Sequence, residues 1–321
     1  VLQSMENVTA RVTGAVKPGM SDKDAFDARK AETAKIEKES LDATGFRSDV
    51  IPLYQGGEYW LYRYKKYTDV RLVFAPEQQT AFFGGDPDNF TYPRYDIDMA
   101  LFRAYENGKP AETPHYLKWN AKGPSDGELV FVSGNPGSTS RLDTMAQIEA
   151  TRDYTLPVTL QILTERLAVL QKYSALGQEQ SRQALGMIFG IQNAIKAFNG
   201  RYAGLEDKAL MAKKQKEEEE FRARVDANPQ WKEAYGPAWD EIVQAEKLFV
   251  QRNKEIRFRG IGGSRQANLA LTIVQYVAEV QKPDGKRLEG FHDSELESLK
   301  FQLFSPAPVY PQMEELLLAD S

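Results

Sequence analysis

The chain has 321 residues, no cysteine, two histidines and a formal net charge of −5, from 41 basic and 46 acidic side chains. Without cysteine it has no disulfide, no thiolate nucleophile and no cysteine-ligated metal site, and two distant histidines leave little for an imidazole metal site. The mild acidity argues against nucleic acid or an anionic membrane as the main partner, since both bind concentrated basic surfaces. No stretch approaches the roughly 20 apolar residues of a membrane-spanning helix.

The composition changes near residue 145. Turn-forming, β-branched and aromatic residues dominate before it, and Ala, Leu, Gln, Glu, Lys and Arg dominate after it. We therefore expect an α+β fold, in which residues 1–144 form a β-rich domain with one helix near 21–41 and residues 145–321 form a helical domain. The chain opens on Val1 without an export signal, and the helical pattern at its end stops without a cap, so we expect a segment of a longer protein.

The early helix, 21–41, begins at Ser21, a good N-cap with Asp24 at the capping-box distance. Its charged residues are expected to form a solvated face: Arg29, Lys30, Glu32, Lys35, Glu37 and Lys38. Extended patterns follow, with a hairpin over 50–54 and 59–64 around Gly56-Gly57 and further strands over 70–74, 95–105 and 128–133.

The second half predicts helices. Between Thr155 and Tyr173, leucines recur at steps of 4, 3, 4 and 3, which draws one apolar stripe along a helix and predicts burial against a neighbour. Five further helices are expected over 181–198, 205–227, 238–249, 264–281 and 293–304, separated by glycine- and proline-containing breaks.

The segment Phe83–Arg103 has the densest cluster of polar and aromatic side chains. Period-2 alternation puts Asp96 and Asp98 on one face of the expected strand. An acid at the start of an apolar strand needs a partner, because an unpaired buried carboxylate is costly.

Three interpretations of this loop stay open from its residues alone. It is a structural turn, with Asp86, Asp88 and Asn89 capping their own backbone and Asp98 paired to Arg94 or Arg103. It is a calcium loop, although Phe90 and Ile97 stand where oxygen ligands are needed. Alternatively, it is a functional loop, in which a rigid sheet positions catalytic or binding side chains.

Longer motifs carry a resemblance between this sequence and a known family. They are Asp69-Val70-Arg71-Leu72-Val73-Phe74-Ala75-Pro76, then Phe83-Gly84-Gly85-Asp86 with Asp88-Asn89, Pro93-Arg94 and Asp98, and lastly Gly134-Asn135-Pro136-Gly137-Ser138-Thr139-Ser140-Arg141. The chain resembles the bacterial serine dipeptidyl peptidases of the dipeptidyl peptidase 7 and 11 type. The resemblance implies a chymotrypsin-like antiparallel β-barrel peptidase domain with an inserted all-α helical domain.

The resemblance also implies site residues. Asp98 matches the acid of a Ser-His-Asp triad, and its Asp98-Met99-Ala100-Leu101 setting is similar to the Asp-Ile-Ala-Leu of chymotrypsin-like enzymes. Asn89 matches the residue that binds the substrate's free α-amino group, with Phe90 beside it where the family usually has Trp. Asn193 matches a second amine-binding Asn, with Asn199 as a rival. Tyr95-Asp96-Ile97 replaces a common His-Thr-Gly, which leaves Asp96 as the alternative acid.

Two members of the family's triad are missing from this chain. No Gly-Asn-Ser-Gly-Ser-Pro motif is found, and Pro136 stands where Gly134–Gly137 would need the nucleophile. His115 reads as a surface residue, and His292 as the neighbour of a helix start. The resemblance therefore implies the central part of a secreted or periplasmic exopeptidase, inactive alone, that acts on peptides with a free N-terminus, forms a homodimer and needs no cofactor or metal. The alternative is a non-enzymatic helical interaction module on a small β platform.

Overall fold

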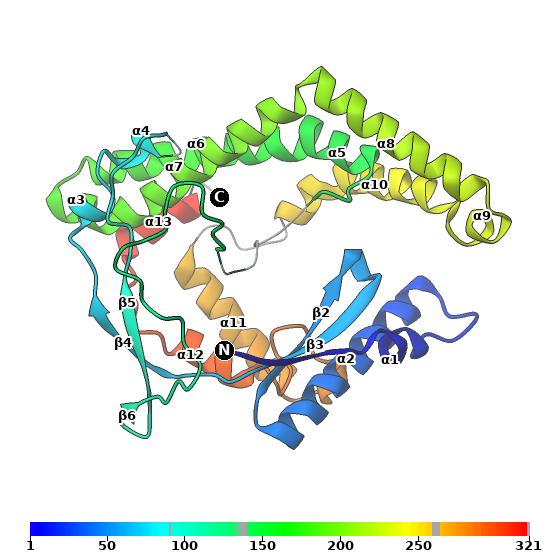
Figure 1. Ribbon diagram of the computed structural model, residues 1–321, viewed down its shortest axis with the longest axis horizontal. Coiled ribbons are helices and arrows are strands. Elements are labelled where there is room, and N and C mark those ends of the chain that lie inside the picture. Colours follow the sequence, from blue (N-terminus) through cyan, green and yellow to red (C-terminus); the bar gives the residue numbers. More distant parts are fainter. Residues whose placement is uncertain (90, 133, 135–139, 259–263, 320–321) are drawn as a thin grey trace. The chain divides into compact units, whose positions relative to one another are not determined.

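The computed structural model describes residues 1–89, 91–132, 134, 140–258 and 264–319 (Figure 1). The chain divides into two compact units, Val1–Arg141 with Glu279–Lys300, and Leu142–Ala278 with Phe301–Ser321. Strands and helices occur together, which confirms the α+β class. The sequence analysis assigned all of 145–321 to the helical domain, whereas the structure assigns Glu279–Lys300 to the first unit.

The first sheet of the first unit is antiparallel, with strand order β1-β3-β2. It consists of β1 (Leu2–Asn7), β2 (Arg47–Leu53) and β3 (Glu58–Tyr64). The predicted hairpin is confirmed, since β2 pairs with β3 and Val50 lies opposite Leu61. Pro52 fits because β2 is an edge strand, where a sheet tolerates proline.

Helix α2 (Asp22–Thr44) packs on this sheet. The predicted cap is confirmed, because the Ser21 side chain accepts a hydrogen bond from the Asp24 amide at 3.2 Å. At the other end Gly45 takes the left-handed conformation and donates to the Leu41 carbonyl. Ile36 of α2 and Val12 of α1 (Thr9–Gly14) are buried with residues of the sheet and form the core of this unit.

The second sheet, also antiparallel, has the order β4-β5-β6. It comprises β4 (Asp69–Phe74), β5 (Leu101–Glu106) and the short β6 (Lys109–Pro110). Residues 75–100 connect β4 to β5 and include two short helices, α3 (Gln78–Ala81) and α4 (Gly85–Asp88).

Two predicted strands are wrong in extent or existence. The strand expected over 95–105 begins only at Leu101, because the Asp96 carboxylate and the Ile97 amide bond to the preceding loop instead of a ladder partner. The described part of 128–133 is irregular and its apolar side chains are exposed. A strand needs a partner for its backbone groups, and these residues have none among the described strands.

The second unit is helical in its described part. The stripe of leucines predicted on α6 (Leu156–Ser174) is confirmed: Leu170 is fully buried, and Leu163 and Leu167 pack against the same cluster. The cluster also includes residues of α7 (Gln178–Leu205) and α13 (Pro311–Ala319). The remaining elements are α5 (Met145–Ala150), a π-helical turn (Thr151–Thr155), α8 (Lys208–Asp226), α9 (Pro229–Tyr235), α10 (Ala238–Phe258) and α11 (Arg265–Glu279), whose last residue belongs to the first unit.

The chain returns to the first unit through a 3₁₀ turn, Asp284–Lys286, and leaves it within α12 (Leu296–Leu303). This return segment is fixed to α2: the Lys38 Nζ lies 2.5 Å from an Asp293 oxygen. Among the residues that the structure describes, no helix is both long and apolar enough to cross a membrane.

Candidate active site

The candidate site is the loop between α3 and β5, which a pair of glycines turns sharply. Gly84 and Gly85 have φ values of 78° and 64°. A Cβ atom at Gly84 would lie 1.8 Å from Asp88 Oδ2, so only glycine fits this turn. Beyond α4 the Asn89 amide donates to the Asp86 carbonyl at 3.0 Å, which fixes the backbone of Asn89 at the end of the turn.

Arg94 connects the two ends of this loop. Its Nε donates to Asp96, its Nη1 lies 3.4 Å from Asn89 Oδ1, and its Nη2 lies 3.4 Å from the Gly85 carbonyl oxygen. The guanidinium also lies over the Phe82 ring, 4.8 Å from its centroid. Because the Arg94 and Asp96 side chains are only 18% and 10% exposed, their opposite charges are poorly screened and neutralise each other.

Asp96 is fully engaged in holding the loop. Besides the pair with Arg94, its Oδ1 accepts from the Phe83 amide at 2.9 Å. The structural-turn interpretation is thus right about an Arg–Asp pair but wrong about its acid, since it paired Asp98 with Arg94 or Arg103. An Arg-x-Asp spacing in an extended segment, with both side chains on one face, is the signal that would have found this pair.

Asp98 has a different environment. It lies in the irregular stretch before β5 and is exposed, which corrects the expected burial on a strand. Within the described ranges its carboxylate has neither a hydrogen-bond donor nor a cation in contact. Asp98 is therefore free to accept a hydrogen bond from a group outside this loop, whereas Asp96 is not.

The other predicted site residues are placed separately. Asn193 and Asn199 are exposed on α7 of the second unit, while Asn89 is half-buried in the first. Phe90 lies outside the described residues, as does most of the Gly134–Arg141 motif. The structure thus brings Asn89, Arg94 and Asp96 together, and the role of Asn193 stays a prediction.

The two histidines differ in environment. His115 is exposed in an irregular segment, as expected of a surface residue. The His292 carbonyl accepts from the Leu296 amide at the start of α12, but its ring is buried, which the sequence did not predict. The ring Nδ1 lies 2.9 Å from the Asp284 carbonyl oxygen and donates to it. Across the described ranges, no group of three histidine or carboxylate side chains is arranged to hold a metal ion.

Comparison with known proteins places these features in a family. The Peptidase S46 family model matches residues 1–321. An Asp/Glu-specific dipeptidyl-peptidase from Shewanella putrefaciens is 30% identical over 78% of this chain and 36% of its own length. A dipeptidyl-peptidase 7 from Capnocytophaga gingivalis is 35% identical over 43% of this chain and 21% of its own length.

The fold has a matching solved structure. Porphyromonas endodontalis DPP11 in complex with the dipeptide Arg-Asp superposes with a TM-score of 0.66 at 21% identity, over 99% of this chain and 47% of that one. The chain therefore spans less than half the length of these relatives. Because the family model covers every residue, the chain belongs to the Peptidase S46 family.

Proposed function

We propose that this chain is the central part of a serine-type dipeptidyl peptidase, an exopeptidase that releases dipeptides from free peptide N-termini. The observation that carries the proposal is the family match over residues 1–321, together with relatives named dipeptidyl-peptidases. The loop geometry supports it, because the loop presents one carboxylate without a partner among the described residues and one half-buried amide.

Asp98 is the proposed triad acid. In this chemistry a serine hydroxyl attacks the scissile carbonyl, a histidine takes its proton and later gives it to the leaving amine, and the acid holds the histidine in the required tautomer. Asp98 suits that role because its carboxylate is available, whereas Asp96 is engaged by Arg94 and the Phe83 amide. The serine and histidine would come from parts of the longer protein outside this chain.

Asn89 is the proposed contact for the substrate's α-ammonium group. An amide oxygen can accept from an ammonium, and Asn89 Oδ1 is already oriented by Arg94. The nearby guanidinium would repel a second cation, but its pairing with Asp96 offsets that charge. By resemblance, Phe90 and Asn193 are proposed as further residues that bind the amine.

The location and assembly of the longer protein are part of the same proposal. We infer a periplasmic or secreted enzyme and a homodimer, both from the family resemblance. Cell fractionation and sedimentation of the complete gene product test these two points.

The test of the function is N-terminal selectivity. The complete gene product is assayed with a dipeptidyl coumarin substrate and with the same substrate acetylated at its amine. The free-amine substrate should be cleaved and the acetylated one should not. Equal cleavage of both would contradict an exopeptidase, and a gene without an upstream His and a downstream Gly-Asn-Ser-Gly-Ser-Pro segment would contradict the serine mechanism.

A further inference from the structure

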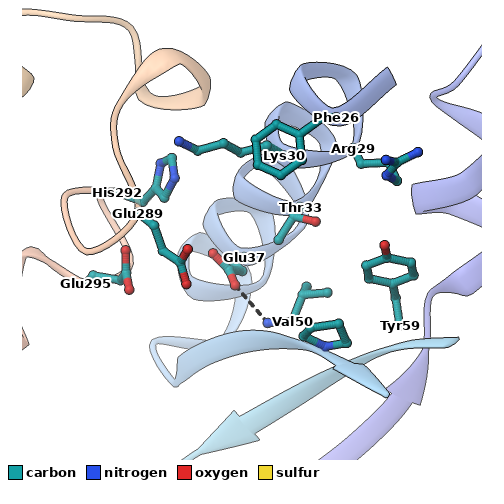
Figure 2. Close-up of a pocket in the computed structure, with 11 residues that line it drawn as sticks. Phe26, Arg29, Lys30, Thr33, Glu37, Val50, Tyr59, Glu289, His292 and Glu295 are labelled. Atoms are coloured by element: carbon teal, nitrogen blue, oxygen red, sulfur yellow. Dashed lines mark hydrogen bonds between the residues drawn. The ribbon is translucent and has the colours of Figure 1, made fainter. Parts of the chain in front are cut away.

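A pocket of about 360 Å³ lies within the first unit. Its volume is in the range of small-molecule sites, about 300 to 1,000 Å³. Helix α2, strands β2 and β3 and the return segment all contribute to its walls (Figure 2). None of its lining residues belongs to the loop of the candidate active site, so the preceding account leaves the pocket unused.

One side of the pocket is rich in carboxylates. Figure 2 shows Glu37, Glu289 and Glu295 gathered there, with Lys30 extending across this side. Glu37 Oε1 accepts from the Val50 amide at 2.7 Å, and Glu295 Oε2 accepts from the Gly290 amide at 2.7 Å. Three acids face one lysine, so this side has surplus negative charge.

Burial, and to a smaller extent the charge of Glu295, raise the pKa of Glu37 to about 7. A cation bound beside the Glu37 carboxyl would be stabilised, because an opposite charge favours the ionised form of the carboxyl.

His292 also lines the pocket, and its ring is 93% buried. Its Nδ1 donates to the Asp284 carbonyl, and in the tautomer that carries its proton on Nδ1 the lone pair lies on Nε2. Among the described residues nothing bonds to Nε2. This atom is therefore available to a hydrogen-bond donor of a ligand.

The opposite side of the pocket is suited to an anion. Arg29 lies there near Tyr59 in Figure 2, and in the described part of the chain its guanidinium has no ion-pair partner. A free guanidinium is a strong, two-pronged donor to a carboxylate. Val50 and Pro52 add apolar side chains to the lining of the pocket.

We propose that this pocket binds a zwitterionic dipeptide, with its ammonium group toward Glu37 and Glu289 and its carboxylate toward Arg29. The opposite charges at the two sides match the two ends of such a ligand, and the volume fits one. The proposal rests on the proposed function only for the choice of a dipeptide among short zwitterions.

Calorimetric titration of the full 321-residue chain tests this binding without any catalytic turnover. The probes are dialanine, N-acetyl-dialanine and dialanine amide. Loss of one charge-assisted hydrogen bond should weaken binding by at least about 10-fold. We expect dialanine to bind that much more tightly than either blocked form. Equal binding of all three probes, or no binding of dialanine, would overturn the proposal.

Variants locate the bound ligand. Arg29→Gln should weaken the binding of dialanine about 10-fold and leave the binding of dialanine amide unchanged. Glu289→Gln should weaken the binding of both dialanine and its amide. Arg103→Gln is the matched control, since Arg103 is an exposed arginine on β5 outside the pocket. If Asn89→Ala abolishes binding and Arg29→Gln does not, the dipeptide occupies the candidate active site and the inference is wrong, although the proposed function survives.

Discussion

Asp96 and Asp98 are two residues apart, yet only one of them is available for chemistry. Asp98→Asn in the complete enzyme should keep the fold and lower kcat by about 10⁴-fold, because an amide cannot hold the histidine in its working tautomer. Asp96→Asn removes charge from the pair with Arg94 and should lower kcat far less. Steady-state kinetics of both variants decide the assignment, and equal losses would show that the acid is misassigned.

Asn89 should determine selectivity for the free amine. A charge-assisted hydrogen bond to the substrate ammonium is worth roughly 1.5 to 3 kcal/mol, so Asn89→Ala should lower kcat/KM by about 10- to 150-fold. The residual activity should also discriminate less between free and N-acetylated substrates. A folded variant that keeps its full preference would show that Asn89 only shapes the turn.

Arg94 should matter for stability. Removing one partner of a mostly buried ion pair leaves the other charge uncompensated, so Arg94→Ala should destabilise the first unit by about 3 kcal/mol. Asp96→Asn leaves Arg94 without its ion-pair partner but should cost less, because Arg94 is the more exposed member of the pair and the Asn oxygen still accepts from the Phe83 amide. Urea unfolding of both variants tests this order, with Arg103→Gln as an exposed control.

At the scale of elements, Glu37 ties the stability of the α2–β2 contact to pH. Its pKa rises from an ordinary 4.5 to about 7 in the fold. The folded state therefore binds more protons than the unfolded state between these values, and stability should fall as pH rises from about 4.5 to 7. The full pKa shift of Glu37 corresponds to a change of about 3 kcal/mol in the free energy of unfolding.

Glu37→Gln should reduce the dependence of stability on pH. Urea unfolding at pH 5 and pH 8 measures it, with Asp42→Asn on the same helix as the control. The charged groups around Glu37 are Asp49 on β2, Glu295 and Glu289 on the return segment, and Lys30 on α2. An unchanged pH slope in Glu37→Gln would assign the dependence to those neighbours.

The elements that the sequence predicts well are those whose structure is determined by residues close together in the sequence. Helix α2 begins at a serine cap, and α6 follows a leucine stripe, so both could be placed before any contact was known. The segment 95–100 could not, because its alternation is typical of a strand while Arg94 draws Asp96 into the loop. Glu37 was expected to face solvent, since a charge pattern alone does not show which residue finds a backbone amide to bind.

At the scale of the whole molecule, the return of Glu279–Lys300 to the first unit is the feature that local pattern could not predict. It depends on side-chain hydrogen bonds between residues more than 250 positions apart in the sequence, such as Lys38 with Asp293 and Glu37 with Ser294. The same limit applies to the candidate site: resemblance named Asn89 and Asp98, but only the fold shows that Arg94 binds Asp96 and leaves Asp98 available.

The central claim is that this chain supplies the acid and the amine contact of a dipeptidyl peptidase whose nucleophile and base lie elsewhere. Turnover of a free-amine dipeptidyl coumarin substrate by the purified 321-residue chain, measured beside the complete gene product, tests it most directly. The complete product should cleave the substrate, and the chain alone should not, because an acid without a serine and a histidine cannot attack a carbonyl. Turnover by the chain alone, or none by the complete product, would contradict the claim.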